Sequence, residues 1–449
     1  MRLKGLRGAW LCVALMLAAA ALLAACGGSG GSETTGGSEG GETTASSDSP
    51  VTIKWLTHNP AETAASESAA EELVAKFNET HPDIEVERES ISRDELNTVL
   101  KTRLQSDDAP DVFQYGTGPT YAGALAQAGL IYPLDAAYKK YHWSFYPWAR
   151  KRMQFDGKQT MGIPDQIEAL GVYYNKDLFK ELGLSVPTTF QEMEATCDKI
   201  KEAGKIPMAF GNKDQWPGAS MFSMAATATV GRKGVDDILY GNGSWNTPAI
   251  VEGIQAVFPE FTEHGCYPES PNGIAYDDAN PLFYSEKAAM LPTGSWLTAE
   301  VLDAASFEVG FFPFPSNGKM PVALSTGLGD GWYVSAKSKH KEEALEFLNY
   351  WFSDEVAKTQ LEVFNTIPAF PVNMAGVELS PLFADIVEQI NASGDNAGYN
   401  LDVITPDKFN QEMYAGFQEV LDGSKSPEQQ ADALEQSWQD SQSKSAEEG

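Results

Sequence analysis

The sequence predicts an α/β fold with more than one domain. Short β-rich runs alternate with helical segments from Val51 onward, and the alternation starts again after Gly162. Such alternation is typical of sheets whose strands are joined by helical crossovers. The chain has 449 residues, a length that is too great for one small domain and comfortable for two.

The individual elements follow from local patterns. Expected strands end at turn residues, and expected helices carry apolar residues at helical spacing. Thr189 is expected to cap a helix, with Glu192 near the capping-box position. The expected strands are 51–56, 84–86, 109–115, 170–174, 206–210 and 332–334, and the expected helices are 64–79, 94–104, 121–129, 175–183, 190–202, 341–352, 407–422 and 427–438.

The N-terminus has the features of a secretory signal. Arg2, Lys4 and Arg7 precede an apolar run from 9 to 25, and small residues then lead to Cys26. The sequence Leu-Ala-Ala-Cys-Gly at 23–27 resembles the lipobox of bacterial lipoproteins, which implies cleavage after residue 25 and a lipid on Cys26. The alternative is an uncleaved membrane anchor, but a run of about 17 residues is at the short limit for a spanning helix.

A polar tether follows. Residues 26–50 are almost entirely Gly, Ser, Thr and Glu after the cysteine, with no aromatic side chain. Such a segment buries too little apolar surface to offset its ordering entropy, so we expect a flexible coil. A short disordered tail is also expected at 441–449.

Charge and cysteine content narrow the function classes. The formal net charge is −31, and loss of the three positive charges in residues 1–25 would make it more negative, so nucleic acid is a poor partner. Two cysteines lie in the body of the chain, Cys197 and Cys266. An extracellular setting allows a disulfide between them, and two separate buried thiols are the alternative.

Several ordered stretches resemble one known family. They span nearly the whole body and comprise residues 109–115, 128–135, 162–179, 187–190, 288–296, 312–315 and 337–348. In composition and order these stretches are similar to family 1 extracellular solute-binding proteins of ABC sugar importers, the maltose-binding type.

The resemblance implies a type II periplasmic-binding fold, in which two α/β lobes are joined by a hinge and ligand binds in the cleft between them. The expected crossings lie near Gly157–Pro164, Phe311–Pro315 and Asn365–Pro371. The expected lobes are 51–161 with 313–366, and 162–312 with 367–440. The resemblance also implies a monomer that delivers carbohydrate to a membrane permease, without a cofactor or a metal.

Aromatic faces and planar polar groups are what a sugar site requires. Trp296, in the Gly-Ser-Trp stretch 294–296, matches a tryptophan that stacks on sugar in the family. Trp216 lies in an expected cleft loop, and Tyr414 falls near a late aromatic of the family. Trp332 faces either the cleft or the core of the sheet.

Polar candidates follow the ends of expected strands, which face the crevice in open α/β sheets. His58 and Asn59 follow the first strand, although turn chemistry would explain them equally well. Tyr115 and Thr117 end the third strand. Glu168 matches a sugar-contacting carboxylate of the family, Asp165 and Gln166 lie beside it, and Asp330 sits in the glycine-rich stretch 327–331. The charged pairs that bind maltose in the family are absent at 58–60 and 116–118, so maltose itself is not implied.

Two other functions compete with sugar binding. A glycoside hydrolase needs two carboxylates about 5–10 Å apart around the scissile bond, and acidic pairs such as Asp277-Asp278 are more often solvated surface. No Gly-x-Ser-x-Gly elbow and no His-x-x-x-His spacing occurs in the sequence. The second competitor is a binding protein for a peptide or a polyamine. The order of the matching stretches and the tryptophan content favour carbohydrate.

Overall fold

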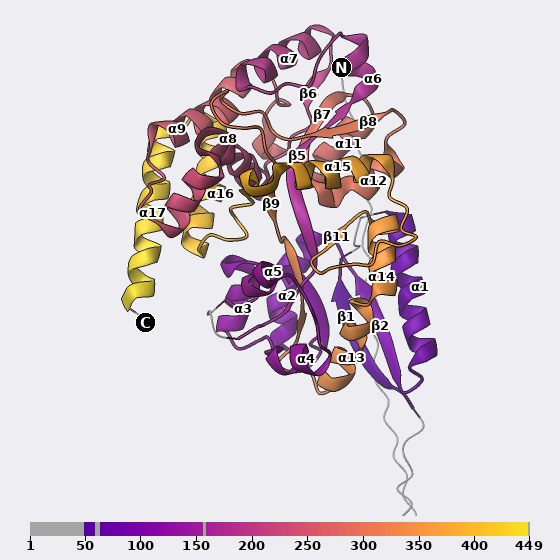
Figure 1. Cartoon of the computed structure of the whole chain (residues 1–449). Coiled ribbons are helices and arrows are strands. Elements are labelled where there is room, and N and C mark those ends of the chain that lie inside the picture. Colours follow the sequence, from indigo (N-terminus) through magenta and orange to yellow (C-terminus); the bar gives the residue numbers. More distant parts are fainter. Residues whose placement is uncertain (1–48, 59–62, 156–158, 448–449) are drawn as a thin grey trace, which may run out of the picture. The chain divides into compact units, whose positions relative to one another are not determined.

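The computed structural model describes residues 49–58, 63–155 and 159–447, without the side chains of Asp94 and of residues 443–447. The predicted signal, the lipidation site Cys26, the tether up to residue 48 and the candidate Asn59 lie outside the described residues. Within them the fold is mixed α/β with two separate sheets (Figure 1), which confirms the predicted fold class.

The five-stranded sheet has the order β2-β1-β3-β10-β4. Strand β1 is parallel to β2 and β3, whereas β10 is antiparallel to both β3 and β4. The strands are β1 (Val51–Thr57), β2 (Ile84–Ser90), β3 (Val112–Gly116), β10 (Asp330–Val334) and β4 (Ile163–Pro164).

The seven-stranded sheet is built around one long strand, β5 (Gln166–Asn175). Its main order is β12-β9-β5-β7-β6, and β8 and β11 also pair with β5. The other strands are β6 (Ile206–Met208), β7 (Ala288–Gly294), β8 (Val309–Phe312), β9 (Ser325–Gly327), β11 (Ile367–Pro368) and β12 (Gly398–Tyr399).

Helices cover both sheets. Figure 1 shows α1, α13 and α14 beside the five-stranded sheet, and α6, α7, α8 and α9 beside the seven-stranded one. The helices are α1 (Ala64–Thr80), α2 (Arg93–Gln105), α3 (Ala124–Gln127), α4 (Asp135–Lys140), α5 (Pro147–Arg152), α6 (Lys176–Glu181), α7 (Phe190–Glu202), α8 (Trp216–Tyr240), α9 (Pro248–Gln255), α10 (Phe261–Glu263), α11 (Tyr276–Tyr284), α12 (Thr298–Ala304), α13 (Lys341–Trp351), α14 (Asp354–Thr359), α15 (Pro381–Ser393), α16 (Asp407–Leu421) and α17 (Pro427–Glu447).

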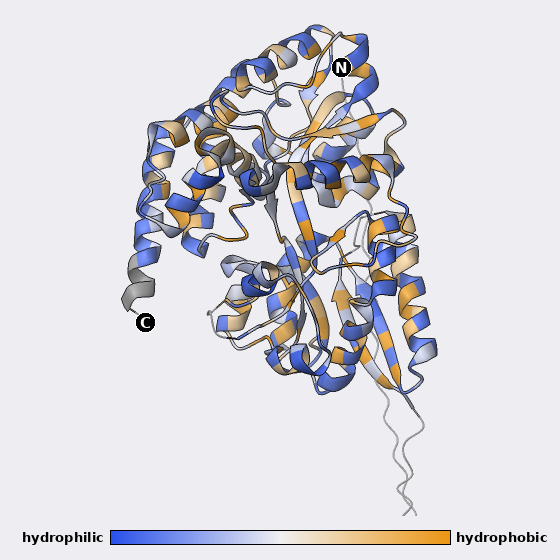
Figure 2. Cartoon of the chain, in the orientation of Figure 1, coloured by the Kyte–Doolittle hydropathy of each residue, from blue (hydrophilic) through white to orange (hydrophobic). Residues whose placement is uncertain are grey.

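Amphipathic patterning explains how the helices pack. Orange and blue residues alternate along α1 in Figure 2, and its buried positions include Leu73, Val74 and Phe77. Helix α7 begins with a full capping box: the Thr189 side chain accepts from the Glu192 N–H, and the Glu192 side chain accepts from the Thr189 N–H. The capping prediction is therefore confirmed.

The core of the five-stranded sheet is rich in tryptophan. Trp55 lies 5.1 Å from Trp332 and 4.7 Å from Trp351 between ring centroids, and all three rings are buried. Trp332 is 1% exposed and therefore faces the core. It packs against Trp351 of α13, with 5.5 Å between ring centroids, so the core is the observed one of the two alternatives that the sequence left open for this residue.

The chain passes between the sheets at three places. The first lies between β4 and β5, close to the predicted crossing, and the third lies next to β11, within the predicted range. The second lies between β9 and β10, at Gly327–Asp330, and not at Phe311–Pro315. Strand β8 ends at Phe312 but β9 is still paired with β5. The predicted lobe limit at 312/313 thus falls before the point at which the chain changes sheets.

The C-terminal segment is helical for longer than expected. Helix α17 continues to Glu447, so the predicted disordered tail at 441–449 is wrong for its first seven residues. Within the described residues, none of the helices combines the length and the apolar character needed to cross a bilayer.

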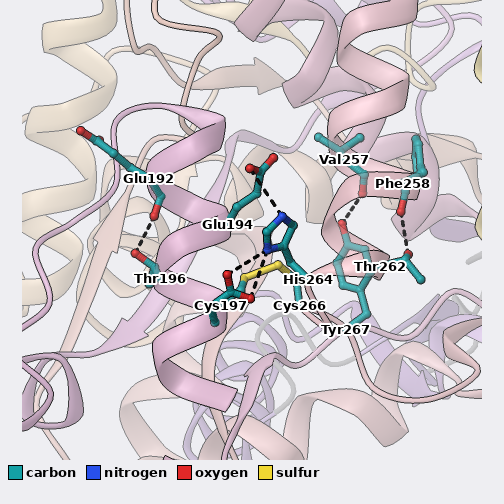
Figure 3. The surroundings of a disulfide bond; sticks show 11 residues. Glu192, Glu194, Thr196, Cys197, Val257, Phe258, Thr262, His264, Cys266 and Tyr267 are labelled. Carbon is teal, nitrogen blue, oxygen red and sulfur yellow. Dashed lines mark hydrogen bonds and ion pairs between the residues drawn. A yellow bond between two sulfur atoms is a disulfide. The ribbon is translucent and has the colours of Figure 1, made fainter. Parts of the chain in front are cut away.

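The structure joins Cys197 and Cys266 in a disulfide (Figure 3). Both residues are fully buried. The bond ties α7 to the turn after α10, where the Met208 N–H also donates to the Cys266 carbonyl at 2.8 Å. Of the two alternatives left by the sequence, the disulfide is the one observed.

Candidate ligand-binding site

An open cavity lies between elements of the two sheets. The space inside it, including the solvent at its mouth, is about 1000 Å³. The five-stranded side contributes the end of β1, helix α2 and the end of β3, and the other side contributes α8, α11 and the segments after β7 and β12. The lining residues are His58, Arg93, Asn97, Gly116, Tyr121, Gln166, Glu168, Asp214, Trp216, Ser220, Tyr276, Asp277, Trp296, Leu297, Gly329, Asp330, Asn400, Asp402 and Val403.

Half of the twelve ligand-binding candidates line this cavity. They are His58, Gln166, Glu168, Trp216, Trp296 and Asp330. Four others, Tyr115, Thr117, Asp165 and Tyr414, do not appear in the lining, and Trp332 is in the core.

Three aromatic side chains form one wall of the cavity, which we call the aromatic wall: Trp216, Tyr276 and Trp296. The ring centroid of Trp216 lies 4.5 Å from that of Tyr276 and 6.0 Å from that of Trp296. The indole N–H of Trp296 donates to the Tyr276 hydroxyl at 3.0 Å. A Cβ at Gly294 would lie 1.9 Å from the Trp296 ring, so only glycine lets the indole lie against the strand end.

The backbone around Trp216 is firmly held. Gln215, just before helix α8, adopts a left-handed φ of 69°, which turns the chain sharply into the helix. The Gly218 N–H donates to Asn212 Oδ1 at 2.8 Å, and Gln418 Nε2 donates to the Asn212 carbonyl at 2.8 Å. These bonds fix the loop that carries Trp216. A residue that stacks on a ligand needs such preorganisation.

The opposite wall is polar and centred on Asp330. The guanidinium of Arg93 donates to both carboxylate oxygens of Asp330, at 3.1 Å for Nη1 to Oδ1, and His58 Nε2 lies 3.2 Å from Oδ2. Asp330 is 1% exposed. Burial alone would raise its pKa, but the charge of Arg93 and the hydrogen bonds from His58 and Arg93 outweigh burial and lower that pKa. The wall thus presents a fixed ion pair.

Glu168 lies on β5, next to this ion pair. It is 5% exposed, and Gln166 Nε2 donates to its Oε1 at 3.4 Å. A Cβ at position 329 would lie 2.2 Å from Glu168 Oε2, so Gly329 leaves the room that the carboxyl occupies. Burial, followed by the nearby charge of Asp330, raises the pKa of Glu168 to about 8. Glu168 is therefore mostly protonated at neutral pH.

Tyr414 lies one layer behind the lining. Its hydroxyl donates to Asp402 Oδ2 at 3.3 Å and lies 3.3 Å from the hydroxyl of Tyr121. Tyr121 and Asp402 are the lining residues. Burial raises the pKa of Asp402 to about 6, against the lowering effects of Tyr414 and the Val403 N–H. The position predicted near the cleft is thus a support for the residues that line it.

Three further candidates also lie behind the lining. Thr117 is fully buried, and its N–H donates to the Gly329 carbonyl at 2.7 Å. Asp165 accepts from Gln114 Nε2 at 2.9 Å, and burial raises its pKa to about 6. Tyr115 packs edge-on against Tyr121 with 5.7 Å between centroids. Thr117 and Asp165 thus hold the segments that cross between the sheets, and Tyr115 supports the ring of Tyr121, which lines the cavity.

Sequence reasoning missed several lining residues. Arg93 is the main one, because its partner Asp330 is 237 residues away and no local pattern links them. Tyr276 lies beside an acidic pair that was interpreted as solvated surface, yet Asp277 lines the cavity. Asn400 and Asp402 follow the very short strand β12, which left no strand signal. Among the described residues, no group of three or more His, Cys, Asp and Glu side chains is placed to hold a metal ion.

Comparisons with known proteins agree with this architecture. Residues 61–358 match the family model described as bacterial extracellular solute-binding protein. The multiple sugar-binding protein of Streptococcus mutans is 28% identical over 340 residues, which cover 74% of this chain and 77% of that protein.

Solved structures have the same fold. One, from work on xylan utilisation by the thermophilic bacterium Caldanaerobius polysaccharolyticus, has a TM-score of 0.76 at 24% identity and covers 86% of this chain and 99% of its own. A chitin oligosaccharide binding protein has a TM-score of 0.75 at 23% identity, over 87% of this chain and 98% of its own.

Proposed function

The chain belongs to the bacterial extracellular solute-binding protein family, and we propose that it captures a di- or oligosaccharide in the cavity between its sheets and delivers it to the membrane permease of an ABC importer. The similarity to a multiple sugar-binding protein and to a chitin oligosaccharide binding protein supports a carbohydrate ligand. The protein acts by binding and release, without a cofactor.

The aromatic wall carries this proposal. Trp216, Tyr276 and Trp296 offer apolar ring faces to the C–H side of a sugar ring, and burial of that side contributes to affinity. Facing them, Glu168 and the Arg93–Asp330 pair supply planar groups for hydroxyls. An unmade buried hydrogen bond costs about 1–3 kcal/mol, which gives this polar wall its selectivity.

Two alternatives make different use of the same cavity. A glycoside hydrolase would use a carboxylic acid and a carboxylate, and Glu168 with the neighbouring Asp330 is one such pair among the five carboxyl groups of the lining. We favour binding because Asp330 is already engaged by the Arg93 guanidinium and His58, which leaves it poorly suited to act as nucleophile or base. Aromatic rings also bind ammonium groups, so the preference for carbohydrate over a peptide or a polyamine rests on the similarity to sugar-binding proteins.

Thermal-shift screening tests the proposal. Residues 50–449 are melted with raffinose, maltotriose, xylotriose, triacetylchitotriose, a tripeptide and spermidine. A ligand at 100 times its dissociation constant adds about 2.7 kcal/mol of stability, so one of the sugars is expected to raise the Tm. A shift with the tripeptide or spermidine alone would contradict the proposal, and so would appearance of cleaved sugar in the same mixtures.

We further propose that a lipid on Cys26 holds the protein at the membrane surface, where the tether keeps it close to the permease. A tether replaces affinity for the permease by effective concentration. Cys26→Ser is expected to leave sugar binding by the purified protein unchanged and to reduce uptake by cells, measured with labelled sugar. Normal uptake with the protein released to the medium would contradict this role.

A further inference from the structure

Three polar side chains at the seven-stranded side of the cavity form a group that we call the acceptor cluster: Ser220, Asn400 and Asp402. Ser220 lies in the first turns of α8, and the other two follow β12. All three line the cavity, and they are only 4, 6 and 5% exposed.

One oxygen of each side chain lacks a hydrogen-bond donor. Among the described residues, Ser220 Oγ, Asn400 Oδ1 and Asp402 Oδ1 are buried and have no partner. A buried acceptor left unpaired costs about 1–3 kcal/mol, and folded proteins pair most of theirs. Because all three residues line one cavity, a bound molecule that packs against them is the available source of donors.

The surroundings of the cluster hold it in place from behind. Asp402 Oδ2 accepts from Tyr414, and its backbone carbonyl accepts from Asn410 Nδ2 at 2.6 Å. The Leu401 N–H donates to Ser223 Oγ at 2.9 Å. The segment after β12 is therefore fixed, and the unpaired oxygen of Asp402 remains for a molecule in the cavity.

Charge in the lining restricts the chemistry of that molecule. Of the five carboxyl groups that line the cavity, Glu168 is mostly protonated and Asp330 is paired with Arg93. The negative charge of the lining therefore comes from Asp214, Asp277 and Asp402. The one guanidinium in the lining, on Arg93, is already engaged by Asp330. A carboxylate and an amide oxygen accept hydrogen bonds but do not donate them, so the cluster suits hydroxyl donors, and a ligand carboxylate would meet like charge.

We infer that the acceptor cluster of Ser220, Asn400 and Asp402 is a subsite that accepts hydrogen bonds from ligand hydroxyls and selects neutral sugars over acidic ones. This inference rests on the proposed function, because it assigns the sugar class that the same cavity takes. The aromatic wall then supplies stacking, and the acceptor cluster supplies discrimination.

Isothermal titration calorimetry with matched variants tests the subsite. The tightest neutral ligand among raffinose, maltotriose, xylotriose and triacetylchitotriose is compared with trigalacturonic acid, on the native chain and on Asp402→Asn, Ser220→Ala and Asn400→Leu. The native chain is expected to bind the neutral sugar at least tenfold more tightly than the acidic one. Asp402→Asn is expected to lower the affinity for the neutral sugar roughly tenfold and to reduce the ratio of neutral to acidic affinity. Ser220→Ala and Asn400→Leu are expected to lower the affinity for the neutral sugar several-fold.

Asp395→Asn, on the exposed turn just before β12, is the control and should match the native chain. The ratio of neutral to acidic affinity separates a ligand contact from a merely structural residue. Substitution of a structural residue would change the melting temperature of the free protein but not this ratio. Native-like affinity and ratio in both Asp402→Asn and Ser220→Ala would overturn the subsite alone. Failure of the native chain to bind any sugar would overturn the proposed function together with it.

Discussion

The two sides of the cavity are built on different principles. The five-stranded side presents an ion pair between the buried Asp330 and the partly exposed Arg93, on a tryptophan-rich core. The seven-stranded side presents the aromatic wall and the acceptor cluster, on a core closed by a disulfide. The first side holds its polar groups rigidly by charge, and the second offers ring faces and unpaired acceptors. The polar groups of the two sides are thus held in different ways, and each side can be altered separately.

The largest effect is expected from the disulfide of the seven-stranded side. Cys197→Ala with Cys266→Ala removes a link between residues 69 positions apart, and loss of a native disulfide typically costs about 2–5 kcal/mol. Urea unfolding should show this loss. Reducing agent should bring the native chain to the stability of the variant; a variant as stable as the oxidised native chain would show that packing around α7 suffices.

The ion pair of the five-stranded side comes next. Arg93→Met leaves the buried Asp330 without its guanidinium, and an uncompensated buried charge costs about 3 kcal/mol or more when a pair is broken; the partial exposure of Arg93 places the expected loss near that lower figure. Urea unfolding measures it. Lys101 is exposed on the same helix, so Lys101→Met should change the free energy of unfolding little. Equal losses of stability in the two variants would show that the ion pair does not stabilise the fold.

Loss of stacking is expected to lower ligand affinity. Trp296→Ala removes a ring of the aromatic wall, and loss of such an anchor costs about 2 kcal/mol, or roughly 30-fold in affinity. Calorimetry with the sugar found by screening gives the value. Trp148→Ala is the control, since Trp148 is 48% exposed and outside the cavity lining. Unchanged binding by the Trp296 variant would move the stacking role to Trp216 or Tyr276.

The smallest effect is the pH dependence of stability that Glu168 causes. Burial raises its folded-state pKa to about 8, above the ordinary value of 4.5, so the folded state binds more protons than the unfolded chain between these values. Stability should therefore fall as pH rises through this window. Glu168→Gln should flatten that fall in melts from pH 5 to 8.5. Glu72→Gln, exposed on α1, should leave it intact.

Local patterns anticipated the elements better than the site. Helices α1 and α7 have clear apolar periodicity and caps, and both lie close to their expected ranges. Helix α8 was missed: its first half is buried on all faces, so it lacks amphipathic periodicity. The second crossing was expected near 311–315 from the family resemblance, whereas the observed link between the sheets is the stretch 327–330.

The site itself depends on contacts that no local pattern encodes. Glu168, Trp216 and Trp296 were found through short motifs that resemble a known family, and all three line the cavity. Arg93 and Asp402 were not found, because their importance comes from partners distant in sequence or from a missing partner in space. Tyr414 was predicted to contact the ligand, but it lies behind the lining and donates a hydrogen bond to the lining residue Asp402.

The close approach of Gly329 to Glu168 links backbone shape to acidity. Because a Cβ at residue 329 would lie 2.2 Å from Glu168 Oε2, even a methyl group there would push the carboxyl out of its pocket and towards water. A carboxyl that regains its hydration also regains an ordinary pKa. The absence of a side chain at Gly329 therefore keeps Glu168 buried and protonated at neutral pH. A protonated Glu168 can donate a hydrogen bond from this wall.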